Sequence, residues 1–228
     1  GIYGGKLLGH ECCGGVEIDN FCQRILKQRQ EDGWMDKFDI YGDLTKLHGQ
    51  QFKGKFDVLC GGFPCQAFSH AAHGDNIAEK NLWPEMFRFV IESNAPIVFG
   101  ENVTLKAIDA ATADLVKIGY RVQRCRLGCE DVGADHRRFR FWLLAVKDEK
   151  VFKKLQKSID ELPIFSNKSW SYNIDTVGEV IPDTDRRAQL KAIGNAQSPV
   201  VAACAFRLLV NRLSEDKYYD ETVSKEEL

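Results

Sequence analysis

Short apolar runs alternate with amphipathic stretches between residues 14 and 146, and this alternation is the strongest constraint on the fold. The apolar runs predict strands at residues 14–19, 39–44, 56–60, 97–99, 120–127 and 140–146. The stretches between them predict helices at residues 21–30, 82–93 and 107–118, the last of which Gly119 closes. Alternating strands and helices favour an α/β fold, in which a mostly parallel sheet carries helices on both faces.

The rest of the chain divides by composition. Residues 1–146 form the predicted core, and residues 147–185 are polar, with Pro163, Pro182 and weak periodicity. We interpret residues 147–185 as a short variable insert. Residues 186–213 predict a closing helix that completes the core, and residues 214–228 form a charged tail that we expect to fray.

The composition excludes several classes of protein. With 228 residues, the chain suits one domain, and its net charge of −2 argues against a generally basic nucleic-acid binder. A nucleic-acid substrate would therefore need a local basic patch. The candidate patches are Arg137, Arg138 and Arg140, and then Arg186, Arg187 and Lys191.

The eight cysteines indicate reduced thiols rather than a disulfide framework or a metal site. Their spacing is irregular, and Cys125 and Cys129 have no second pair at zinc-ligand spacing. No run approaches the roughly 18 apolar residues of a membrane span, and we recognise no secretory signal. We therefore expect a cytosolic protein without a bound metal.

The nonapeptide GGFPCQAFS at residues 61–69 follows the apolar run at residues 56–60. It carries Cys65 on a tight turn just beyond a strand's carboxyl end, where open α/β sheets place their ligands. Glycine permits close backbone approach and Pro64 fixes its own φ, so the turn sets the direction of the thiol. An isolated cysteine is more often a small hydrophobic side chain, and its neighbours here favour the functional interpretation.

This nonapeptide closely resembles the catalytic motif of the DNA cytosine-5 methyltransferases, in which a Pro-Cys cysteine attacks the base. Glu101-Asn102-Val103 matches the family's Glu-Asn-Val motif, and Arg138 and Arg140 match two arginines that enter an apolar strand. The resemblance implies that Cys65 adds to C6 of a flipped cytosine and that Glu101 contacts N3 and the exocyclic amine. It also implies that Arg138 approaches O2 and that Arg140 braces the site, with Asn102 beside Glu101.

The resemblance also implies a Rossmann-like fold that binds S-adenosylmethionine at its strand ends. Glu17 stands where an acidic side chain binds ribose hydroxyls, Ile18 would cover the adenine, and Asp43 would accept a bond from its amine. The full set of implied cofactor-binding residues is Glu17, Ile18, Asp43, Leu44, Phe63, Pro64, Leu82, Asn195 and Ala196.

Double-stranded DNA is the implied partner. Gln66, Ser69 and Arg137 are the implied DNA contacts, and residues 70–80 correspond to the family's loop that closes over DNA. The resemblance further implies a monomer in the cytoplasm of a bacterium or encoded by a phage, away from membranes, with a restriction endonuclease as a second partner.

The chain departs from the family pattern in three places. We recognise no apolar strand with a glycine-rich loop before Glu17, so we expect the first strand to be missing and the chain to be truncated. The target-recognition region is reduced to residues 147–185. Asp135 and His136 stand where many members have proline and glutamine, which leaves the conformation of that loop open.

Three alternatives to a DNA methyltransferase stay open. One is a catalytically impaired remnant that only binds DNA or a partner, and a second is an RNA cytosine methyltransferase with the same motifs. The third is a cysteine hydrolase, for which His70, His73 or His136 would have to act as the base. Cofactor binding, RNA substrates and a hydrolysis assay distinguish them.

Overall fold

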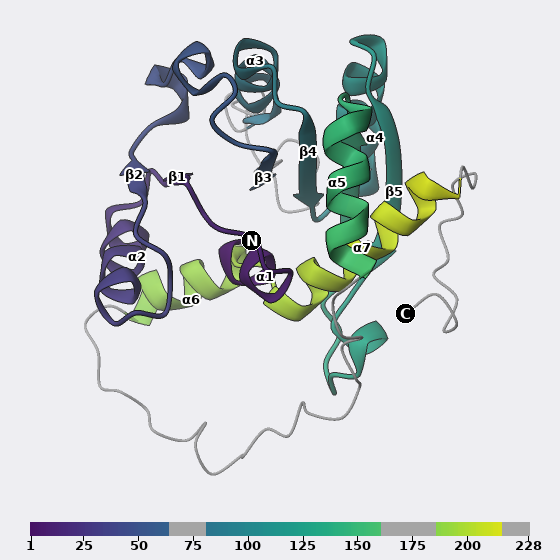
Figure 1. Ribbon diagram of the computed structural model, residues 1–228. Coiled ribbons are helices and arrows are strands. Elements are labelled where there is room, and N and C mark those ends of the chain that lie inside the picture. Colours follow the sequence, from purple (N-terminus) through teal and green to yellow (C-terminus); the bar gives the residue numbers. More distant parts are fainter. Residues whose placement is uncertain (64–80, 161–185, 216–228) are drawn as a thin grey trace.

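Strand β4 (Ile97–Asn102) is the centre of the fold, and all six of its residues are buried. It pairs in parallel with β3 (Val58–Gly62) and antiparallel with β6 (Arg140–Val146). β5 (Arg121–Leu127) then pairs antiparallel with β6, so the strand order is β3-β4-β6-β5. A computed structural model describes residues 1–63, 81–160 and 186–215, and Figure 1 shows their arrangement.

A second, two-stranded sheet stands apart from the first. β1 (Gly14–Val16) and β2 (Asp39–Tyr41) pair in parallel and are connected by α2 (Asn20–Glu31). Within the described residues no ladder joins this pair to β3, which lies at the edge of the four-stranded sheet. The remaining elements are α1 (Ile2–Leu7), η1 (Leu44–Lys46), η2 (Gly49–Phe52), α3 (Trp83–Ser93), α4 (Leu105–Lys117), η5 (Glu130–Val132), α5 (Glu149–Asp160), α6 (Arg186–Asn195) and α7 (Pro199–Ser214).

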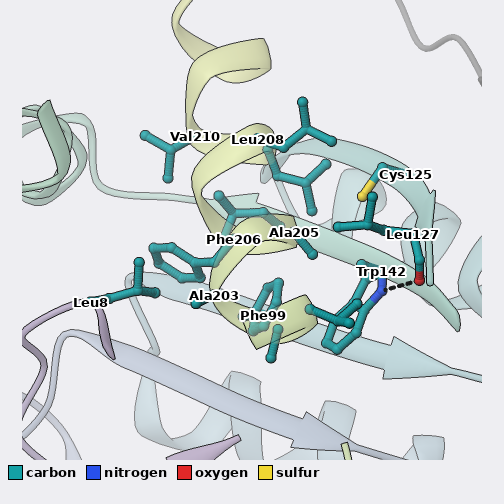
Figure 2. Packing of buried hydrophobic residues seen from close by; sticks show 14 of the residues in the cluster. Leu8, Phe99, Cys125, Leu127, Trp142, Ala203, Ala205, Phe206, Leu208 and Val210 are labelled. Atoms are coloured by element: carbon teal, nitrogen blue, oxygen red, sulfur yellow. Dashed lines mark hydrogen bonds between the residues drawn. The ribbon is translucent and has the colours of Figure 1, made fainter. Parts of the chain in front are cut away.

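The alternation of side chains along the central strands builds a core on each face of the larger sheet. Phe99 and Trp142 point to the face that α1, α5 and α7 cover, whereas Val98 and Leu143 point to α3 and α4. Figure 2 shows the first of these cores, where Phe206 of α7 packs edge-on against Phe99. Strand side chains alternate with a period of two, so a strand buried on both faces is apolar throughout.

Helix α7 is a core helix. Ten of its residues are buried, among them Phe206 and Leu209. The stretch Lys191–Ser214 is long and apolar enough to cross a membrane by composition alone. It is not one continuous helix, because α6 ends at Asn195 and α7 begins at Pro199, and α7 covers the sheet. Its apolar composition is thereby explained by packing inside the protein.

The predicted α/β class and the helices on both faces are confirmed, and the predicted strands and the helices expected at residues 21–30, 82–93 and 107–118 occur in the described residues. The single closing helix expected over residues 186–213 is instead two helices, α6 and α7, separated at residues 196–198. The expectation of a mostly parallel sheet is wrong for the larger sheet, because β6 inserts antiparallel between β4 and β5. The weak periodicity expected after residue 146 is also wrong for α5, whose Phe152 and Ile159 are buried in the core. The proposed domain boundaries stay predictions.

Candidate active site

Glu101 and Arg140 form an ion pair at one end of the larger sheet. The two residues lie on neighbouring strands, β4 and β6, and Arg140 Nε is 3.0 Å from Glu101 Oε1. Their side chains are only 9% (Glu101) and 18% (Arg140) exposed, so solvent screens the pair weakly. Glu101 also pairs in register with Gly62, near the end of β3. The structure therefore brings two of the predicted catalytic residues together beside the strand that leads to Cys65.

Burial governs the ionisation of this pair. It raises the pKa of Glu101, while the hydrogen bond from Gln197 and the charges of Arg140 and Arg138 act in the opposite direction. Burial also lowers the pKa of Arg140, and the charge of Arg138 adds to this effect. Both shifts favour the neutral forms, as desolvation does. Glu101 is thus better suited to hold or donate a proton than an exposed glutamate.

Asn102 ties the ends of β3 and β4 together. Its Nδ2 donates to the carbonyl oxygen of Phe63 at 2.7 Å, and its Oδ1 accepts a bond from the Thr104 amide at 3.1 Å. Phe63 is itself buried and packs against Trp83, with ring centroids 4.9 Å apart. Asn102 therefore holds the carbonyl that immediately precedes Pro64.

Arg138 lies in the loop before β6 and contacts the turn between α6 and α7. Its Nη2 donates to the carbonyl oxygens of Gly194 at 2.8 Å and Ala196 at 2.7 Å, with Ile193 at 3.2 Å. The carbonyls at the end of a helix lack partners within it, and a cation there also interacts favourably with the helix dipole. Arg138 thus joins the loop before β6 to this turn, whereas Arg140, two residues later, contacts Glu101.

The preceding residue on this loop, Arg137, forms an ion pair with Glu130 at 3.3 Å, and its side chain is 83% exposed. Such an exposed pair is worth little in water and leaves the guanidinium accessible. The other predicted basic cluster lies on α6. Its Lys191 pairs with Asp19 at 2.9 Å, and this contact joins α6 to the loop after β1.

The predicted nucleoside-binding residues gather at the carboxyl ends of β1 and β2. Glu17 Oε1 accepts a bond from the Asp19 amide at 2.8 Å, and Ile18 between them is 70% exposed. Asp43 Oδ1 accepts bonds from the amide of Thr45 at 2.9 Å and from its hydroxyl at 2.7 Å. These bonds lower the pKa of Asp43. The site thus offers two carboxylates and one exposed apolar side chain.

A neighbouring helix holds the loop that follows Asp43. Arg88 of α3 donates to the carbonyl oxygens of Leu44 at 2.7 Å and Leu47 at 3.1 Å. The same guanidinium pairs with Glu92, whose Oε2 accepts a bond from the Gly49 amide at 2.6 Å. Sequence reasoning missed this support, because nothing local distinguishes Arg88 from an ordinary surface arginine.

Gln197 was also missed. Its Nε2 donates to Glu101 Oε2 at 3.2 Å, across 96 positions in sequence. It follows the predicted Asn195 and Ala196, which are exposed on the turn that Arg138 contacts. Leu82 caps the start of α3, next to the buried Trp83. The predicted residues that lie outside the described part of the chain are Pro64, Cys65, Gln66 and Ser69, together with the loop at residues 70–80, most of the predicted insert and most of the tail.

Comparison with known proteins identifies the family. The family described as C-5 cytosine-specific DNA methylase matches residues 3–203. The chain belongs to the C-5 cytosine-specific DNA methylases. Type II methyltransferase M.MspI of Moraxella sp is 29% identical over 164 residues, which cover 65% of this chain and 36% of that protein. Type II methyltransferase M.Eco47II of Escherichia coli is 35% identical over 108 residues, or 44% of this chain and 25% of that protein.

Solved structures support the fold of this methylase chain. A DNMT2 mutant of Spodoptera frugiperda matches with a TM-score of 0.53 and 18% identity, covering 64% of this chain and 46% of that one. The S. pombe Dnmt2 methyltransferase matches with a TM-score of 0.51 and 17% identity, covering 63% and 45%. The chain therefore has the Rossmann-like methyltransferase fold, and it spans less than half the length of these relatives.

Proposed function

We propose that this chain transfers a methyl group from S-adenosylmethionine to C5 of cytosine in DNA, through a covalent bond between Cys65 and C6. The observation that carries the proposal is the buried pair of Glu101 and Arg140, which lies beside the end of β3. The sequence continues from that strand end to Cys65 within three residues. Membership of the C-5 cytosine-specific DNA methylases supports the assignment.

Cytosine C5 is a weak nucleophile and needs covalent activation. The Cys65 thiolate adds to C6, and the electron pair of the C5–C6 double bond makes C5 nucleophilic. S-adenosylmethionine supplies an electrophilic methyl group when bound. Loss of the C5 proton after methylation restores the double bond and expels the thiolate. Asn102 serves this chemistry by fixing the carbonyl of Phe63, two residues before Cys65.

Glu101 balances the charge that this addition creates. Attack at C6 increases electron density at N3 of the base, where a proton from Glu101 would stabilise it. The raised pKa of Glu101 suits that role at neutral pH. Arg140, at 3.0 Å, holds the carboxyl group in place. These contacts favour Arg140 as the arginine nearest the base and Arg138 as the one that braces the turn, the reverse of the roles implied by the resemblance.

The residues at the ends of β1 and β2 fit the nucleoside part of S-adenosylmethionine. Glu17 is positioned to accept bonds from ribose hydroxyls, Asp43 to accept one from the adenine amine, and Ile18 exposes an apolar side chain for the adenine ring. Leu44 is held beside them by Arg88. The remaining contacts are assigned to Phe63, Pro64, Leu82, Asn195 and Ala196 by resemblance.

Duplex DNA is the proposed substrate, with the target base extruded from the helix. Extrusion costs a few kcal/mol, which DNA contacts must offset. We assign such contacts to Gln66, Ser69 and the exposed Arg137. The relatives named type II methyltransferases support a restriction–modification setting. We propose a restriction endonuclease as the second partner. A monomer in the cytoplasm of a bacterium, or encoded by a phage, completes the proposal.

Transfer of labelled methyl from S-adenosylmethionine to cytosine-containing duplex DNA tests this function. We expect transfer by the parent chain, none by Cys65→Ala, and unchanged transfer by Cys13→Ala, which removes an exposed thiol before β1. Transfer that persists in Cys65→Ala would refute the covalent mechanism. Transfer to RNA but not to DNA would refute the assigned substrate, and binding of DNA without transfer would identify a non-catalytic remnant.

A further inference from the structure

Gln197 reaches the proposed acid from outside the strands that carry it. Its carboxamide Nε2 donates to Glu101 Oε2 at 3.2 Å, while Arg140 Nε lies 3.0 Å from the other carboxylate oxygen. The two oxygens of Glu101 are therefore engaged by different partners, one neutral and one charged. A carboxylate held at both oxygens has a fixed orientation, which a proton donor to a base needs.

The backbone of β3 packs closely against Glu101 and Gln197 at Gly62. A Cβ atom on Gly62 would lie 2.8 Å from Glu101 Oε2 and 3.4 Å from Gln197 Nε2. The hydrogen bond between Glu101 and Gln197 thus runs directly over a glycine that leaves no room for a side chain. Arg138, which donates to the carbonyls of Gly194 and Ala196, sets the position of the turn that carries Gln197.

We propose that Gln197 is a positioning residue for Glu101, and that the turn after α6 controls the orientation and proton affinity of this carboxyl group through it. This inference rests on the proposed function, in which Glu101 is the acid that protonates N3. A neutral amide suits the task, because it can orient the carboxyl group without fixing it in the charged state as a lysine would. It can also release the oxygen when a base arrives.

Among the described residues, the other charged side chains that act on Glu101 are Arg140 on β6 and Arg138 in the loop before it. Both lower the pKa of Glu101, as the bond from Gln197 does, and burial opposes them. Changing only residue 197 leaves both charges in place.

Two substitutions of similar length distinguish positioning from general packing. Gln197→Met removes the donor, so we expect the pKa of Glu101 to shift upward. Gln197→Lys replaces the neutral donor by a cation, so we expect a downward shift. Gln51→Met, at an exposed glutamine in η2, is the control and should leave the pKa unchanged. The measurement is a pH titration by ¹³C NMR of carboxyl-labelled glutamate, with the Glu101 signal assigned from Glu101→Gln.

Methyl transfer across the same pH range separates this inference from the proposed function. If the pKa of Glu101 shifts in opposite directions in the two variants, the positioning role of Gln197 is supported. If the pH dependence of methyl transfer that is due to Glu101 shifts in the same directions, Gln197 also affects catalysis. If the pKa of Glu101 shifts in opposite directions but the chain transfers no methyl group, the contact between Gln197 and Glu101 is supported and the proposed function is refuted. Equal pKa values in the parent, Gln197→Met and Gln197→Lys would overturn the inference, whether or not the chain is active.

Discussion

Gly62→Ala tests how closely the acid of the site depends on the backbone beside it. The new Cβ atom would lie 2.8 Å from Glu101 Oε2, whereas ordinary contacts begin at 3.4 Å, so the oxygen must move by about 0.6 Å. Such a movement breaks the 3.2 Å bond from Gln197 and strains the 3.0 Å contact with Arg140. The structure therefore predicts a change in the site that leaves the fold intact.

The size of the effect follows from the bonds involved. A hydrogen bond to a charged group is worth about 1.5–3 kcal/mol, which corresponds to a loss of roughly 10- to 150-fold in methyl transfer. The free energy of unfolding should change by less than about 2 kcal/mol, because the displaced atom ends a side chain and alanine also restricts the unfolded chain. Urea unfolding and labelled-methyl transfer measure the two quantities.

Gly61→Ala is the matched control on the same strand. Its Cβ atom would meet only the end of the Met86 side chain, at 3.4 Å. We expect parent-like methyl transfer and equal or slightly greater stability. If Gly61→Ala and Gly62→Ala transfer methyl groups at the same rate, the close packing of Glu101 against β3 has no bearing on catalysis and the reasoning is refuted.

Three further predictions concern stability. Because the pKa of Glu101 is raised in the folded state, this residue contributes stability that is present below its ordinary pKa of 4.5 and is lost as the pH rises through the folded pKa. The free energy of unfolding of the parent, relative to that of Glu101→Gln, should therefore fall as the pH rises. A difference that does not change with pH would contradict the shift. Gly49→Ala should cost about 1–3 kcal/mol in urea unfolding, because its Cβ would lie 2.8 Å from the Phe89 carbonyl oxygen. Phe206→Ala should cost about 3–5 kcal/mol, because Phe206 is buried against Phe99, whereas Ile193→Ala, at an exposed site, should change the stability by less than about 0.5 kcal/mol.

The helices and strands follow from sequence patterns, but the direction of pairing does not. Residues 97–99 and 141–146 are apolar because both strands are buried on both faces. The same pattern fits parallel and antiparallel neighbours, so the insertion of β6 could not be predicted. Helix α5 was overlooked because its lysines dominate the composition, although Phe152 and Ile159 lie seven positions apart on one face.

The candidate site, too, is only partly predictable from the sequence. Motifs on the chain predict Glu101 and Arg140, and register between adjacent strands then brings them together. Gln197 could not be predicted, because its contact with Glu101 depends on how the turn after α6 meets the sheet. The different contacts of Arg138 and Arg140 have the same cause, since two arginines in one motif differ only in where the fold directs them.

Covalent trapping tests the central claim most directly. Duplex DNA in which 5-fluorocytosine replaces cytosine blocks loss of the C5 substituent, so a bond between sulfur and C6 persists after methyl transfer. Mass spectrometry of the digested complex should find the base attached to Cys65 in the parent and in Cys13→Ala, and no adduct in Cys65→Ala. Methylation of ordinary DNA without a trapped adduct, or an adduct on a different cysteine, would contradict the account.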